Sequence, residues 1–63
     1  MMQPPTSEEI RDARKAVGLT QAQAAELVHA SLNGWHQWEK GLRPMGLAHW
    51  ELFLIKTGQA ADK

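Results

Sequence analysis

The sequence predicts a small all-α domain of four helices, with a short fifth helix as the alternative. Three hydroxyl residues stand where a side chain can cap the free N–H groups of a new helix: Thr6, Thr20 and Ser31. Apolar residues recur at helical spacing after them. Glycines follow several of these segments and favour a left-handed end. The expected helices are residues 6–17, 21–28, 32–40 and 47–56.

The length and composition predict a single domain with a small hydrophobic core. The 63 residues form a single unit, with residues 1–5 as an arm and 58–63 as a polar tail. A chain of this size buries only about 60% of its extended surface. The absence of cysteine excludes disulfides and thiolate metal sites, which fits a reducing compartment. With no long apolar run and no signal-peptide pattern, we expect a soluble cytoplasmic protein.

The first helix is predicted from its capping signals and its apolar stripe. Thr6 and Glu9 have the spacing of a capping box, in which each side chain bonds the backbone N–H of the other residue. Ile10, Ala13 and Val17 then repeat at the spacing of one helix face, and we expect that face to be buried.

Residues 20–41 read as two short helices joined by a tight turn. Thr20 and Gln23 form a second capping-box pair, Ser31 opens the next helix, and Gly41 stops it. Trp35 and Trp38 lie three apart and should face the core. Two capped helices with so short a connection must cross steeply, which predicts a helix-turn-helix motif.

This segment resembles the DNA-binding motif of the Cro/lambda-repressor-like (Xre) family. The matching residues are Thr20–Gln21, Ala25 and Trp38–Glu39–Lys40–Gly41, and the likeness extends over residues 6–56. His29 departs from the pattern, because this turn position is usually Gly and tends to need a positive φ.

The resemblance implies a domain that binds double-stranded DNA. It implies that Gln21 contacts phosphate at the start of its helix, although this side chain could instead help cap that helix. It also implies an ion pair between Arg14 and Glu39 that braces the first helix against the third. The alternative is two independent surface charges.

Base recognition is expected from the outward face of the helix at 32–40. Its candidate residues are Leu32, Asn33, His36 and Gln37. Asn and Gln amides can pair with adenine through two hydrogen bonds. Leu32 could contact a thymine methyl group or pack on the turn.

Phosphate contacts are expected around this face. The candidates are Gln21, Ser31, Lys40 and Arg43, although the two cations could simply be solvated. Seven basic and seven acidic residues give no net charge, whereas DNA-binding domains often carry a basic excess. A local patch is sufficient to engage phosphate.

The last helix is apolar nearly all round. We expect Leu47, Trp50 and Leu54, with Phe53 at the edge, to face the core. A second stripe is then left for a two-fold homodimer interface: Ala48, Leu52 and Ile55. The opposite assignment, with this second stripe facing the core, remains open.

These features predict a sequence-specific transcriptional regulator that binds a palindromic operator as a homodimer. We expect a repressor, because the chain leaves no room for an activation or sensing domain. The resemblance implies an autoregulatory repressor of phage or mobile-element type. The alternative is an antitoxin-like protein-interaction module that uses the last helix. His29, His36 and His49 lack metal-ligand spacing, so no enzyme activity, metal or cofactor is expected.

Overall fold

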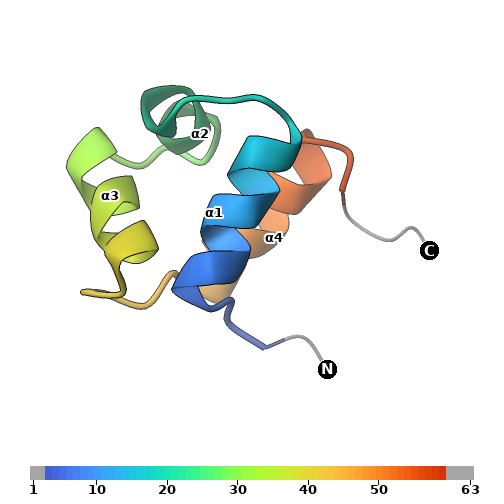
Figure 1. Ribbon diagram of the computed structural model, residues 1–63. Coiled ribbons are helices and arrows are strands. Elements are labelled where there is room, and N and C mark those ends of the chain that lie inside the picture. The colour runs from blue at the N-terminus through green and yellow to red at the C-terminus, as the bar shows by residue number, and fades with distance from the viewer. Residues whose placement is uncertain (1–2, 60–63) are drawn as a thin grey trace.

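The computed structural model describes residues 3–59 and contains four helices and no strand within them (Figure 1). They are α1 (Ser7–Ala16), α2 (Gln21–Leu27), α3 (Leu32–Lys40) and α4 (Leu47–Lys56). The predicted bounds of α3 and α4 are confirmed, and the all-α fold with them. The outermost parts of the expected arm and tail, and any fifth helix there, lie outside the described residues.

The first two helices are each shorter than predicted because their terminal residues are caps. Thr6 is the N-cap of α1 and accepts the Glu9 amide at 3.1 Å, while its own amide donates to Glu9 Oε1 at 2.9 Å. Val17 and Val28 are the C-caps of α1 and α2. A second capping box joins Thr20 and Gln23 at the start of α2.

All four helices end in the same hydrogen-bonded turn. In α2, the Ala30 amide donates to the Ala25 carbonyl at 2.9 Å and the His29 amide to the Glu26 carbonyl at 3.2 Å. This pair of bonds requires a left-handed residue at the end of the helix. The four left-handed residues are Gly18, His29, Gly41 and Gly58. His29, with φ at 60°, is thus the only side-chain-bearing residue at this position in the part of the chain described.

A small apolar core joins all four helices. Its buried members are Ile10, Ala24, Ala25, Val28, Trp35, Met45 and Phe53. The two alanines lie on α2, where small side chains let the neighbouring helices approach. The Trp35 and Phe53 rings pack with their centroids 5.1 Å apart, which ties α3 to α4.

The structure confirms part of the α4 stripe that was expected to face this core and corrects the rest. Trp50 and Leu54 pack against the core, partly buried, as expected. Phe53, expected at the edge, is the central and fully buried residue of α4, while Leu47 is 36% exposed. The ring of Phe53 packs against Trp35, and Leu47, six residues earlier, lies about 120° away around the helix, so it points outward. Of the stripe assigned to a dimer, Ile55 is 64% exposed, but Leu52 is partly buried against the core.

Candidate nucleic-acid interface

Helix α3 presents a polar face directly after the tight turn. Ser31 caps the helix by accepting the Gly34 amide at 3.0 Å. Asn33, His36 and Lys40 are exposed, and Gln37 is half-buried. Leu32 is 53% exposed, so it is not buried against the turn. An exposed apolar side chain at the start of α3 can contact a thymine methyl group.

An open hollow lies where the start of α2 meets the first turns of α3. It is lined by Gln21, Leu32, Asn33 and His36. The fold therefore gathers three of the four residues expected to read bases, beside one of those expected to contact phosphate. Gln37 and Lys40 do not line the hollow and lie further along α3.

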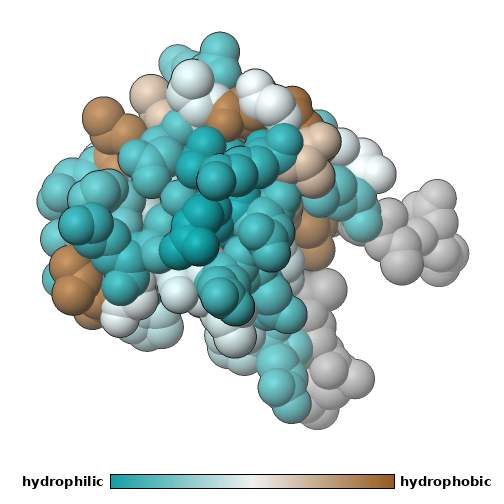
Figure 2. All heavy atoms as spheres, in the orientation of Figure 1, coloured by the Kyte–Doolittle hydropathy of each residue, from teal (hydrophilic) through white to brown (hydrophobic). Residues whose placement is uncertain are grey.

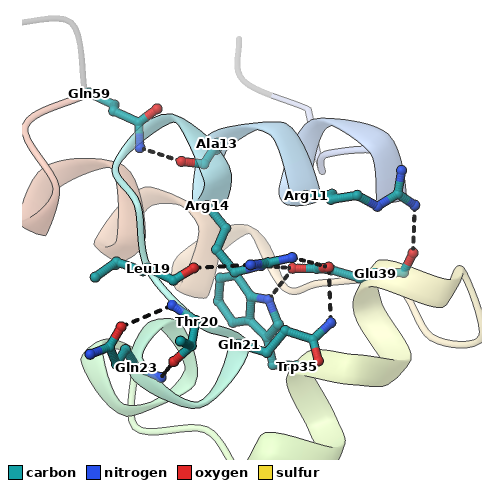
Figure 3. Close-up of polar contacts among 10 residues, drawn as sticks. All are labelled: Arg11, Ala13, Arg14, Leu19, Thr20, Gln21, Gln23, Trp35, Glu39 and Gln59. Atoms are coloured by element: carbon teal, nitrogen blue, oxygen red, sulfur yellow. Dashed lines mark hydrogen bonds and ion pairs between the residues drawn. The ribbon is translucent and has the colours of Figure 1, made fainter.

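The buried carboxylate of Glu39 joins the first three helices (Figure 3). Arg14 of α1 donates from Nε to Oε2 at 2.6 Å and from Nη2 to Oε1 at 3.1 Å. Gln21 of α2 donates its amide to Oε1 at 3.0 Å. The indole N–H of Trp35 donates to Oε2. Arg14 also bonds the Leu19 carbonyl, so the guanidinium fixes the connection between α1 and α2.

This network keeps Glu39 charged. Burial by itself raises the pKa of the Glu39 carboxyl, but hydrogen bonds from Arg14, Trp35 and Gln21 outweigh it and hold that pKa below its usual range. The guanidinium charge of Arg14 acts in the same direction. A charged carboxylate with several donors is a stable anchor for the carboxyl-terminal end of α3.

The network also fixes Gln21. Its amide N–H group faces Glu39, and Figure 3 shows its carbonyl oxygen on the side away from that carboxylate. Neither interpretation of the sequence included this bond, and the phosphate contact expected of Gln21 stays a prediction. One amide hydrogen remains available for a phosphate oxygen, because the bond to Glu39 uses only the other.

The charges of the chain are unevenly distributed. Between residues 27 and 50 the sequence has a single acidic residue, Glu39, and this is buried and paired with Arg14. Lys40 and Arg43 are exposed in the same stretch. The surface of α3 and its flanking loops therefore lacks exposed negative charge, although the whole chain is neutral. This local imbalance is what phosphate contact requires.

Gly34 is the residue whose amide Ser31 caps at the start of α3. A Cβ at this position would lie 3.2 Å from the Ser31 hydroxyl, which is a tight contact. The matching positions of α1 and α2 carry the side chains of Glu9 and Gln23, so the cap does not by itself require glycine.

Sequence reasoning missed three of the contacts that shape this region. The first is the Trp35–Glu39 bond, for which the spacing of four residues on one helix was an available signal. The others are the Gln21–Glu39 bond and a contact from Arg11 to the Glu39 carbonyl. Both join separate helices, so no local pattern indicates them.

Comparison with known families agrees with this geometry. A helix-turn-helix domain family matches residues 7–54 of the 63-residue chain. The chain belongs to this helix-turn-helix family. The match is consistent with the Cro/lambda-repressor-like resemblance and indicates a DNA-binding regulator of a typically non-enzymatic family. A search of curated proteins found no match.

None of the helices within residues 3–59 has the length and apolar character needed to cross a membrane. Over the same residues, no group of three or more His, Asp or Glu side chains is arranged to hold a metal ion.

Proposed function

We propose that this helix-turn-helix protein is a sequence-specific transcriptional repressor that binds double-stranded DNA. The observation that carries the proposal is the hollow between α2 and α3, lined by Gln21, Leu32, Asn33 and His36, on a segment, residues 27–50, that has no exposed acidic residue. A recognition helix with these properties can enter the major groove, where base edges offer a distinct pattern of donors and acceptors.

In this proposal the outward face of α3 reads the bases. Asn33 and Gln37 lie four residues apart on that face, so their amides can reach neighbouring base pairs. His36 lies between them and can donate to or accept from a base edge. Leu32 supports the same role, because it is exposed and lines the hollow rather than packing on the turn.

Phosphate contacts would position the domain without reading sequence. Ser31 can donate its hydroxyl hydrogen to phosphate, since its capping bond uses only an oxygen lone pair. Gln21 can offer its second amide hydrogen. Lys40 and Arg43, exposed at the other end of α3, supply positive charge.

Operator binding as a homodimer is the second part of the proposal. The outer face of α4 exposes Ile55 and Ala48, with the half-buried Leu52 beside them. A two-fold partner would cover this apolar surface with its own copy, and the small Ala48 would permit close approach. Two recognition helices about 34 Å apart would then read a palindrome in successive major grooves. Repression would follow from occlusion of a promoter, including that of its own gene.

The competing function is an antitoxin-like interaction module, and the same exposed apolar face of α4 favours it. Fluorescence anisotropy on labelled duplexes separates the two. We expect a site selected from a random duplex pool to bind more tightly than unrelated DNA, and log Kd to rise steeply with log salt, by about 0.9 per phosphate contacted. Binding without a salt slope, or no binding, would reject the DNA-binding role and favour the interaction module.

A further inference from the structure

Helix α1 lies across the carboxyl-terminal end of the recognition helix. Arg11 Nη2 lies 3.4 Å from the Glu39 carbonyl oxygen, where Figure 3 shows the guanidinium above that oxygen. One turn earlier on α1, Ser7 approaches Gly41, since a Cβ at Gly41 would lie 3.8 Å from the Ser7 hydroxyl. The face of α1 that carries both residues therefore borders the end of α3.

The bond from Arg11 to this carbonyl is weak. Its length of 3.4 Å is beyond the usual range for N–H···O bonds. The guanidinium has five N–H donors, and this contact satisfies one of them. Within residues 3–59 the only ion pair joins Arg14 to Glu39, so Arg11 has no carboxylate partner there, although Glu8 and Asp12 are near it in the sequence. Most of its donors are thus available to a ligand.

The neighbours of Arg11 define which ligand fits. Lys40 directly follows Glu39 in the chain, and Arg43 lies in the loop just beyond it; both are exposed. The side of the molecule that carries α1 and α3 is covered mainly by hydrophilic side chains (Figure 2). Two segments far apart in sequence therefore bring three cations to one end of the recognition helix. A guanidinium suits a phosphate group because it can donate two parallel hydrogen bonds.

We propose that Arg11 is a third contact to the DNA phosphate backbone, beside Lys40 and Arg43 at the carboxyl-terminal end of α3. This inference rests on the proposed DNA-binding function and extends its interface to α1. Arg11 does not line the hollow that holds the base-reading residues. It therefore positions the domain on DNA and carries no sequence information directly.

The test compares Arg11→Gln with Lys15→Gln, which removes the same charge from the same helix one turn further from the end of α3. Anisotropy on the preferred and on an unrelated duplex, over a salt series, gives the log–log slope for each protein. We expect Arg11→Gln to weaken binding to both duplexes alike and to reduce the slope by about 0.9, the value of one phosphate contact. Arg11→Lys should retain the slope, and Lys15→Gln should match the wild type.

The outcomes separate the inference from the function on which it rests. Thermal unfolding of each variant is measured alongside binding. If Arg11→Gln lowers the unfolding midpoint but keeps the wild-type salt slope, Arg11 only caps the Glu39 carbonyl and the inference is overturned. A wild-type slope with an unchanged midpoint overturns it equally. If the wild-type protein itself binds no duplex, the proposed DNA-binding function is rejected, and the inference about Arg11 is rejected with it.

Discussion

The indole N–H of Trp35 is bonded to the carboxylate of Glu39, one turn further along α3. This contact joins the most buried aromatic side chain of the recognition helix to the one buried charge that links α1, α2 and α3. The hydrophobic core and the polar brace are therefore a single unit. The orientation of the outward face of α3 depends on both.

Arg14 and Glu39 should be strongly coupled in stability. Removal of one partner from a buried pair costs about 3–5 kcal/mol, because the other charge is left unpaired. We expect Arg14→Met and Glu39→Gln each to destabilise the domain, and the double variant to lose less than the sum. Urea unfolding should give a coupling above about 0.5 kcal/mol. The exposed Glu51→Gln control should change stability little, and additive effects would mean independent charges.

Stability should fall in acid as Glu39 becomes protonated. Its pKa is lower in the folded protein than in the unfolded chain, so the unfolded chain binds the proton first. The contribution of Glu39 is therefore fully present above about pH 4.3, the ordinary Glu value, and is lost as the pH falls through the lower folded pKa. Urea unfolding between neutral pH and about pH 3 should show this loss. In Glu39→Gln this part of the pH dependence should be absent.

Replacement of His29 by glycine should stabilise the protein. A left-handed conformation costs an ordinary residue roughly 1–2 kcal/mol, whereas glycine adopts it freely. Part of the gain is offset by the greater freedom of glycine in the unfolded chain, so we expect about 1 kcal/mol in urea unfolding. His36→Gly, made inside α3, should instead destabilise by roughly 0.3 kcal/mol, the difference in helix propensity between His and Gly. Destabilisation by His29→Gly would show that the imidazole has a structural role.

Gln37→Ala should reduce specificity more than general affinity. If Gln37 pairs with a base, its loss should cost about 1–3 kcal/mol on the preferred duplex and leave unrelated DNA nearly unaffected. Competition anisotropy with duplexes altered one base pair at a time should show relaxed selection at one position. Gln3→Ala, outside the helices, is the control. Equal losses on preferred and unrelated DNA would make Gln37 a backbone contact.

Ile55→Glu should give a folded monomer with weak operator binding. Ile55 is 64% exposed, so a charge there disturbs a partner and not the core. Leu52→Glu should also unfold the domain in part, because Leu52 packs against the core. Sedimentation and circular dichroism measure the two effects. Ala16→Glu adds the same charge on the exposed end of α1 and should leave the oligomeric state unchanged. A dimeric Ile55→Glu protein would place the interface elsewhere.

The sequence alone determined the elements of this protein. Thr6, Thr20 and Ser31 marked three of the four helix starts, since a capping hydroxyl bonds residues only three positions away. Gly41 marked a helix end for a similar local reason, because its left-handed conformation is intrinsic to glycine. The helix-turn-helix motif could be recognised because it is built from such short-range signals in a fixed register.

The tertiary structure decided how these elements face one another. Phe53, and not Leu47, became the centre of the α4 contact because the ring of Trp35 lies opposite it, and helical spacing alone does not choose between adjacent stripes. Gln21 donates a hydrogen bond to the carboxylate of Glu39 because α2 and α3 cross at this point. Such contacts depend on the crossing geometry of whole helices, which is set by the packing of the core and not by the residues near each side chain in sequence.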